Sequence, residues 1–363
     1  MTKISPNKNQ VKTFQDWLLS WFSRHGRTDL PWQVNKTLYR VWISEIMLQQ
    51  TQVSTAIPYY LKFMEKFPDL LSLANSHLDT ALSYWAGLGY YARARNLHAA
   101  AIQILENHAG IFPSQLDLVI KLPGIGLSTA SAILSIAENQ PLAICDGNVK
   151  RVLSRLHCVD FPLNTPSAEK ILWDLAEQYM PEKNCADYSQ AIMDLGATLC
   201  TKSQPRCLDC PVNSICQAYL TKTQETYPIP KKPLARKTKY QSCLIFITST
   251  HIALTQRPNT GIWGGLFTPI MANRLNNGSN PKDHPLFSQH AHHPYIYIDK
   301  QKHVFTHFDL YYDAYVFKLE NPALIENTNW YSFEILETLA LPAPIKTLLI
   351  KTKIYKKNLG VPQ

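Results

Sequence analysis

The sequence predicts two domains of different fold class, and its 363 residues are enough for both. Apolar residues near the start recur at the spacing of one helix face, namely Phe14, Trp17, Leu18, Trp21 and Phe22. Residues 226–242 are rich in Pro and Lys, which is typical of an extended linker. Beyond them the chain turns to β-branched and aromatic runs such as 244–248, which indicate strands. We therefore expect a mostly α-helical domain over 1–225 and an α/β domain over 243–363.

The pattern of helical period returns several times before the linker. It recurs near residues 40–50, 78–85, 92–105, 128–137, 148–157, 167–180 and 187–199, with Pro and Gly between. After the linker, residues 295–298 alternate as a strand does, and 303–317 are expected to form one long strand.

The composition argues against a secreted or membrane-spanning protein and favours a negatively charged partner. The N-terminus is polar without the apolar core of a signal peptide, and no apolar run is long enough to span a bilayer, so we expect a cytoplasmic protein. Its formal net charge is +9, and residues 226–243 contribute five basic and no acidic side chains. This excess favours a polyanionic partner but does not identify one.

Four cysteines fall on one short stretch in the pattern C-x6-C-x2-C-x5-C: Cys200, Cys207, Cys210 and Cys216. Such a density of thiols in a cytosolic chain indicates metal binding rather than disulfides. Zinc remains a candidate, but zinc sites usually show two C-x2-C pairs. The irregular gaps favour a [4Fe–4S] cluster.

Residues 122–130 read as a Pro-Gly-x-Gly turn that leads into a helix. Gly124 and Gly126 allow a tight turn, and the free N–H groups at the helix start can bind a phosphate oxygen. A simple packing joint between two helices is the alternative.

Asp146 stands directly before another predicted helix. An Asp in this position is a good N-cap, and Asn148 follows two residues later. A carboxylate fixed beside a phosphate-binding element also suits a cation that forms on a sugar. The two interpretations are compatible, because capping would hold the carboxylate in place.

Glu45 is an isolated acid in an apolar stretch. Burial there should raise its pKa and let it act as a general acid. Gln49, Gln50 and Gln52 follow it and offer donors and acceptors suited to base edges. A polar surface helix is the alternative.

The segment 87–95 combines two glycines, two tyrosines and two arginines. Aromatic rings beside arginines can wedge between bases while phosphates are held. Tyr90 is the candidate wedge, although tyrosines buried in a core would leave a similar pattern.

Together these motifs resemble the helix–hairpin–helix DNA glycosylases over residues 14–220, and most closely the adenine DNA glycosylase (MutY) family. The resemblance implies a helix–hairpin–helix at about 118–136 and a [4Fe–4S] loop at 200–216. Bifunctional relatives of the endonuclease III type carry a nucleophilic Lys where this chain has Ser128. Those relatives also end soon after the cluster, whereas this chain continues.

The second domain carries its own resemblance. The segments 263–267 (WGGLF) and 303–308 (HVFTHF) look like the Nudix-like domain that reads 8-oxoguanine in this family. The family often has Ser where this chain has Thr306. A Nudix hydrolase needs clustered glutamates, and Asp283 is the one acid between Gly264 and His290, so pyrophosphatase activity is not expected.

The resemblance implies a monomeric, nucleoid-associated bacterial enzyme that removes adenine mispaired with 8-oxoguanine or guanine in duplex DNA. Glu45 would protonate adenine at N7, Asp146 would stabilise the sugar cation, and Ser128 would lie near that sugar. The implied substrate and DNA contacts are Arg27, Trp32, Gln49, Gln50, Tyr90, Gly124, Gly126, Asn148, Lys150, Asp194, Phe305, Thr306 and His307. An endonuclease III-like glycosylase/lyase and a non-catalytic iron–sulfur DNA-binding protein are the alternatives.

Overall fold

The computed structural model describes residues 5–163, 165–230, 235–274, 284–305, 307–325 and 327–355. The chain forms two compact units. The first comprises Met1–Asn75 and Asn96–Pro233, and the second comprises Ser76–Arg95 and Leu234–Gln363. Among the described residues, no helix is both long and apolar enough to cross a membrane.

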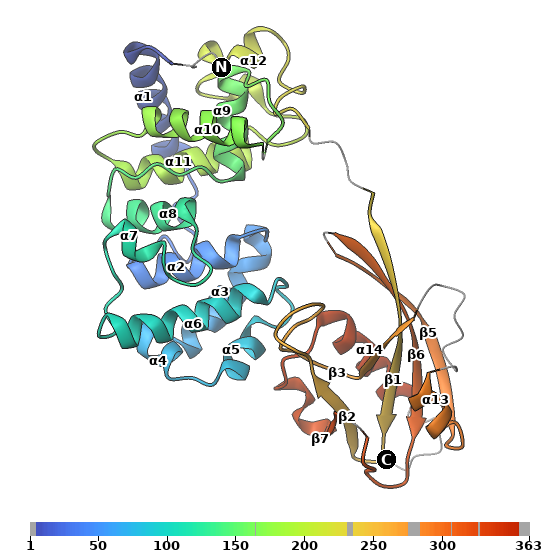
Figure 1. Cartoon of the computed structure of the whole chain (residues 1–363). Coiled ribbons are helices and arrows are strands. Elements are labelled where there is room, and N and C mark those ends of the chain that lie inside the picture. Colours follow the sequence, from blue (N-terminus) through green and yellow to red (C-terminus); the bar gives the residue numbers. More distant parts are fainter. Residues whose placement is uncertain are drawn as a thin grey trace. The chain divides into compact units, whose positions relative to one another are not determined.

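The first unit is helical, as the sequence predicts (Figure 1). Its long helices are α1 (Lys8–His25), α2 (Leu38–Leu48), α3 (Val53–Lys66), most of α6 (Ala92–Asn107), α8 (Leu127–Glu138), α9 (Gly147–His157), α10 (Pro166–Tyr179) and α11 (Cys185–Thr198). Its short elements are α4 (Leu70–Ala74), α7 (Leu116–Val119), η1 (Cys207–Asp209), η2 (Asn213–Ile215) and α12 (Gln217–Leu220). The core lies where α1, α8, α9, α10 and α11 meet, and the ring of Phe14 there packs edge-on against Tyr179 at 4.8 Å.

Local sequence determines where these helices begin and end. The side chain of Asn7 caps α1, and Thr165 caps α10 with Pro166 in its first turn. Helix α8 ends at Asn139 in the left-handed conformation, which Asn tolerates. The sequence pattern does not predict α3, because Pro58 lies inside it, where a proline usually interrupts a helix.

The helix–hairpin–helix consists of α7, a turn and α8. Gly124 in the turn has φ +77, and a Cβ atom there would lie 2.7 Å from the Cβ of Asn96. Glycine is therefore required by both conformation and space. Gly126 is the N-cap of α8, and a Cβ there would meet nothing within 4 Å.

The second unit is built around a mixed seven-stranded sheet in the order β3-β2-β1-β6-β5, with β4 pairing β1 and β7 pairing β2. The strands are β1 (Lys237–Ile247), β2 (His251–Gln256), β3 (Phe267–Thr268), β4 (Ile270–Arg274), β5 (Tyr295–Val304), β6 (Phe308–Lys318) and β7 (Asn329–Ser332). The remaining elements are α5 (Leu78–Trp85), α13 (Pro285–His290), η4 (Phe333–Glu337) and α14 (Ala343–Tyr355). Strands β1 and β6 are parallel, and Phe246 and Phe317 stack in the core between them.

Two details differ from the sequence-based expectation. Residues 303–317 belong to two strands instead of one. Strand β5 ends at Val304, and β6 begins at Phe308 as its antiparallel partner. No Gly or Pro marks this turn, so the sequence pattern predicts one continuous strand across it. The expected linker is also shorter, since β1 begins at Lys237 and pairs with β6 from that residue on.

Candidate active site

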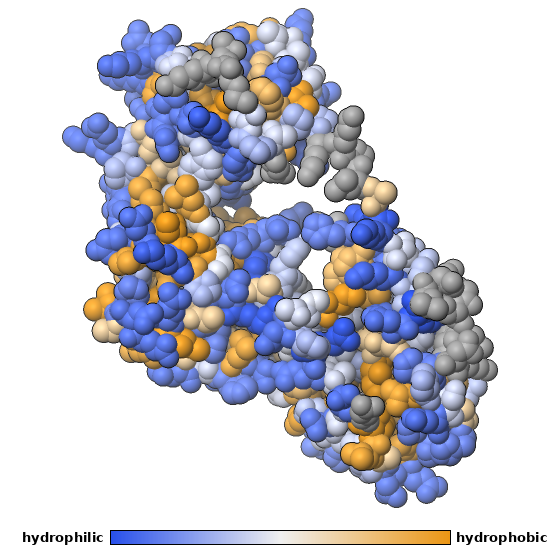
Figure 2. Space-filling view, in the orientation of Figure 1, coloured by the Kyte–Doolittle hydropathy of each residue, from blue (hydrophilic) through white to orange (hydrophobic). Residues whose placement is uncertain are grey.

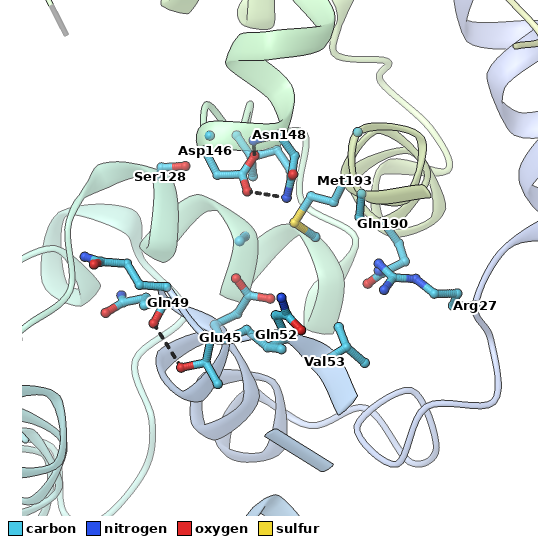
Figure 3. A pocket seen from close by; sticks show the side chains of 18 of the residues that line it. Arg27, Glu45, Gln49, Gln52, Val53, Ser128, Asp146, Asn148, Gln190 and Met193 are labelled. Atoms are coloured by element: carbon cyan, nitrogen blue, oxygen red, sulfur yellow. Dashed lines mark hydrogen bonds between the residues drawn. The ribbon is translucent and has the colours of Figure 1, made fainter. Parts of the chain in front are cut away.

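A pocket of about 900 Å³ opens in the first unit between α2, α8, α9 and α11 (Figure 3). Nine residues expected from the sequence line it: Arg27, Trp32, Glu45, Gln49, Gln50, Gln52, Ser128, Asp146 and Asn148. They come from segments more than 100 residues apart in the chain. The fold therefore brings together the motifs around Glu45, Ser128 and Asp146.

Glu45 lies in the last turn of α2 and points into the pocket (Figure 3). Glu45 is half-buried, between the buried residues Ser44 and Ile46 of the same helix. Burial and, secondarily, the charge of Asp146 raise the pKa of Glu45 to about 8. At neutral pH this carboxyl is therefore protonated and can donate a proton.

Asp146 is the N-cap of α9 and is held by three hydrogen bonds. Its Oδ1 accepts from the backbone N–H groups of Asn148 at 3.0 Å and Val149 at 2.8 Å. Its Oδ2 accepts from the side chain of Asn148 at 3.1 Å. Burial raises the pKa of Asp146, but these donors and the charge of Arg151 oppose that rise. The same contacts fix the carboxylate toward the pocket.

Ser128 lies in the first turn of α8 and contacts the segment that leads to Asp146. The backbone N–H of Cys145 donates to Ser128 Oγ at 3.0 Å. Ser128 thus lines the pocket and also anchors the residue that precedes Asp146.

The glutamines after Glu45 leave the helix in a sharp turn. Gln49 is the C-cap of α2, and its Nε2 donates to Thr129 Oγ1 at 3.3 Å. Gln50 has φ +57, an uncommon conformation for a residue with a side chain. The turn directs both amides to the rim of the pocket together with Gln52.

Arg27 and Asp194 form a clamp at the far side of the pocket. The guanidinium of Arg27 donates to Asp194 Oδ1 at 2.6 and 3.1 Å, and its backbone N–H donates to Oδ2 at 2.8 Å. Asp194 is almost fully buried and does not line the pocket, so it acts through Arg27 and Gln190. Gln190 is not among the residues predicted from the sequence, although its place one helical turn before Asp194 indicates a contact between the two. Trp32 is buried against Tyr60.

Two further residues that the sequence analysis missed link α9 to α11. Arg151 donates to the carbonyl oxygens of Gly196 and Cys200, each at 2.7 Å, and to Asn148 Oδ1 at 2.8 Å. A Cβ at Gly196 would lie 2.6 Å from the Cβ of Asn148. The start of α9, and with it Asp146, therefore depends on close approach to α11. Met193 of α11 also lines the pocket.

The cysteine loop packs against the other end of α9. Arg155 is buried and donates to Cys200 Sγ at 3.3 Å and to the carbonyl oxygen of Thr201 at 2.7 Å. Burial raises the pKa of Cys210 to about 12 and that of Cys216 to about 11, while nearby backbone N–H groups oppose the rise. Among the described residues, no group of three or more His, Cys, Asp or Glu side chains is arranged to hold a single metal ion.

Lys150 and the two hairpin glycines are further sequence-predicted DNA contacts that lie outside the pocket lining. Lys150 forms an ion pair with Glu169 at 2.6 Å. In the cysteine loop, Lys202 lines the pocket, whereas Arg206 pairs with Asp209 in η1. The glycines 124 and 126 belong to the hairpin rather than to the pocket.

The remaining predicted residues belong to the second unit. Tyr90 has φ +50 and is 47% exposed, with the guanidinium of Arg93 5.5 Å from its ring centre. Phe305 lies in an aromatic group with Trp263 at 5.8 Å, His303 at 4.6 Å and Phe308 at 4.6 Å. His307 is exposed beside this group. Thr306 lies outside the described residues, as does Asp283.

Two family models match this chain. Residues 43–178 match the HhH-GPD superfamily of base excision DNA repair proteins, and residues 242–351 match the NUDIX domain. The first range contains Glu45, Ser128 and Asp146, and the second contains most of the mixed sheet.

Curated relatives match along nearly the whole chain. An adenine DNA glycosylase of Buchnera aphidicola subsp. Baizongia pistaciae is 38% identical, covering 95% of this chain and 98% of the relative. An adenine DNA glycosylase of Rattus norvegicus is 31% identical, covering 96% of this chain and 79% of the relative.

Solved structures resemble a large part of the chain. A thermostable thymine-DNA glycosylase is 26% identical with a TM-score of 0.52, covering 59% of this chain and 98% of that one. An endonuclease III in a non-covalent DNA complex has a TM-score of 0.51 at 20% identity, covering 61% of this chain and 100% of that one, which supports the fold alone.

Proposed function

The chain belongs to the adenine DNA glycosylases of the HhH-GPD base excision repair superfamily, hydrolases of N-glycosidic bonds, and on that premise we propose how its pocket acts. A base inside a duplex is out of reach, so adenine must be flipped out of the helix. The pocket of about 900 Å³ at the carboxyl of Glu45 is large enough to receive it. This juxtaposition of pocket and protonated acid carries the proposal.

Glu45 is the proton donor in this mechanism. Because its pKa is raised to about 8, it holds a proton at neutral pH. Transfer of that proton to adenine N7 turns the purine into a better leaving group. Gln190 and Arg27, which line the same pocket, offer polar groups that can orient the base.

Asp146 stabilises the positive charge that develops on the sugar as the bond breaks. Its hydrogen bonds to the start of α9 hold an anionic carboxylate in one place before the reaction begins. The use of two carboxyl groups, one protonated and one ionised, is the pattern of glycoside cleavage.

Ser128 supports a monofunctional enzyme over the endonuclease III-like alternative. A lyase needs an amine that forms a Schiff base, and this position holds a hydroxyl that already accepts a hydrogen bond from Cys145. We therefore expect excision to leave an intact abasic strand. Strand cleavage by the native protein without added base or heat would instead support the lyase.

The second unit supplies the preference for the base opposite adenine. Phe305 and His307 flank the turn between β5 and β6, and Trp263 packs beside Phe305. Aromatic rings at an exposed turn can contact a damaged base from one side. We assign recognition of 8-oxoguanine to this turn. We also assign a wedge role beside the lesion to Tyr90 of this unit and, separately, to Gln49 of the first unit.

The four cysteines would hold a [4Fe–4S] cluster. The donor set fits that group, because it comprises four thiols on one short loop and Arg155 donates a hydrogen bond to Cys200 Sγ. When bound, the cluster would order the loop rather than take part in bond cleavage. Iron and sulfide analysis of the purified protein tests this assignment, and stoichiometric zinc without iron would overturn it.

Single-turnover excision of adenine opposite 8-oxoguanine, guanine and thymine tests the proposed function. We expect the highest rate opposite 8-oxoguanine and a lower rate opposite guanine. Equal rates opposite all three would refute the lesion-reading role of the second unit. A monomeric state and a cytoplasmic, nucleoid-associated location remain predictions.

A further inference from the structure

The sheet of the second unit carries a group of cations on one face, close to the turn between β5 and β6. In the strand register Tyr311 of β6 lies opposite Tyr240 of β1 and Lys302 of β5. Residues directly opposite each other on neighbouring strands share a face, and so do residues two apart on one strand. The cationic face therefore comprises Arg236, Tyr240, Lys300, Lys302, Asp309 and Tyr311.

Contacts across three strands hold these side chains together. The ammonium groups of Lys300 and Lys302 lie 5.5 and 5.2 Å from the ring centre of Tyr311, and Tyr240 stacks on that ring at 5.8 Å. Asp309 accepts from Lys302 at 2.9 Å and from Arg236 at 3.3 Å. One carboxylate in β6 thus organises cations on both flanking strands.

The charge on this face is unbalanced and faces solvent. Arg236, Lys300 and Lys302 are exposed, and Asp309 is the carboxylate that pairs with two of them. The next acid on the face, Asp313, is already neutralised by Arg274 at 2.7 Å. In Figure 2 hydrophilic residues cover the place where β1 begins. Apart from the Arg274–Asp313 pair, the face carries three cations and one carboxylate, that of Asp309, so its net charge is positive.

We propose that the cationic face docks the phosphate backbone of duplex DNA. This rests on the proposed function, in which the chain acts on double-stranded DNA. Lysine ammonium groups are suited to phosphate oxygens as point charges, and the tyrosine rings beneath hold their stems in place. Because β5 and β6 meet at the turn of Phe305 and His307, a phosphate held here anchors the strand close to the base that the turn contacts.

The salt dependence of binding tests this docking. Affinity for an undamaged duplex is measured by fluorescence anisotropy between about 50 and 200 mM salt, and each lost phosphate contact reduces the slope of log K against log salt by about 0.9. The double variant Lys300→Gln/Lys302→Gln should reduce the slope by about 1.8. Lys300→Arg/Lys302→Arg should keep the wild-type slope.

The control removes the same charge elsewhere on the unit. Lys346 and Lys351 are exposed on α14, so Lys346→Gln/Lys351→Gln matches the net charge of the first double variant. We expect this control to keep the wild-type slope. An equal decrease in both double variants, or no decrease in either, would overturn the proposal.

The outcome is separable from the proposed function. Adenine excision is measured separately on the wild-type protein and on the control Lys346→Gln/Lys351→Gln, which should match wild type because it touches neither the cationic face nor Glu45 and Asp146. If the native protein failed to excise adenine while the slope still fell, the proposed function would be refuted and the docking surface would stand.

Discussion

Glu45 and Asp146 line one pocket from two different helices, and the charge of Asp146 adds to the burial that raises the pKa of Glu45 to about 8. The carboxyl of Glu45 is therefore kept protonated, whereas that of Asp146 is surrounded by hydrogen-bond donors. This division of roles gives the first prediction.

Adenine excision should decline in alkaline solution. The active form carries a protonated Glu45, and above a pKa of about 8 each further pH unit reduces that form about tenfold. Single-turnover rates from about pH 6 to about pH 9 should show a plateau followed by this decline. A rate that stays constant over the whole range would contradict the assignment of Glu45.

Glu45 should also destabilise the folded protein as the pH rises. Its folded pKa is raised, so its contribution to stability is complete below the unfolded pKa of about 4.3 and is lost as the pH rises toward about 8. Glu45→Gln should therefore gain unfolding free energy relative to wild type over that window. Urea denaturation at several pH values measures the difference, and a gap that shrinks with rising pH would contradict the raised pKa.

Asp146→Asn should preserve the fold. Asn caps a helix about as well as Asp, and its Oδ1 can still accept from Asn148 and Val149, so unfolding free energy should change by less than about 1 kcal/mol. Asp146→Ala removes the cap and should cost about 1 kcal/mol. Thermal denaturation should show that Asp146→Ala loses more stability than Asp146→Asn. Equal losses of stability would show that the cap contributes little.

Gly196→Ala should impair the site from a distance. The added Cβ would lie 2.6 Å from the Cβ of Asn148, which donates to Asp146, so α9 must shift. We expect a loss of about 1–3 kcal/mol in unfolding free energy and excision about tenfold to a hundredfold slower. In the matched control Gly147→Ala, the added Cβ meets nothing within 4 Å. If the first variant behaved like the control, Gly196 would have no positioning role.

Asp194→Asn should weaken the clamp on Arg27. Asp194 is buried and accepts from both the guanidinium and the backbone of Arg27. Removal of one partner from a buried ion pair typically costs about 3–5 kcal/mol of unfolding free energy. Because Arg27 keeps some solvent exposure, we expect a cost at the low end of this range. Chemical denaturation measures it, and an unchanged midpoint would mean that the pair contributes no stability.

The sequence predicts the individual motifs of the site better than the contacts between them. Glu45 and Asp146 stand out because each is a carboxylate in a distinctive local setting. Gly196 and Arg151 do not, since their importance arises from contact between α9 and α11, 45 residues apart in the chain. Asp194 is implied by the family resemblance rather than by its local setting, and in the structure it holds Arg27 instead of facing the pocket.

In the second unit the strand pattern predicts the sheet but not its turns. Residues 303–317 alternate as one strand, yet the chain reverses between Val304 and Phe308 without Gly or Pro. Pairing of β5 with β6, a tertiary choice, overrides the local pattern there.

The most direct test of the account is single-turnover excision of adenine opposite 8-oxoguanine by wild type, Glu45→Gln and Asp146→Asn, with DNA binding measured in parallel. We predict that both variants bind the duplex as wild type does and excise adenine at least about 100-fold more slowly. Excision at the wild-type rate by either variant would contradict the catalytic role assigned to that carboxyl group.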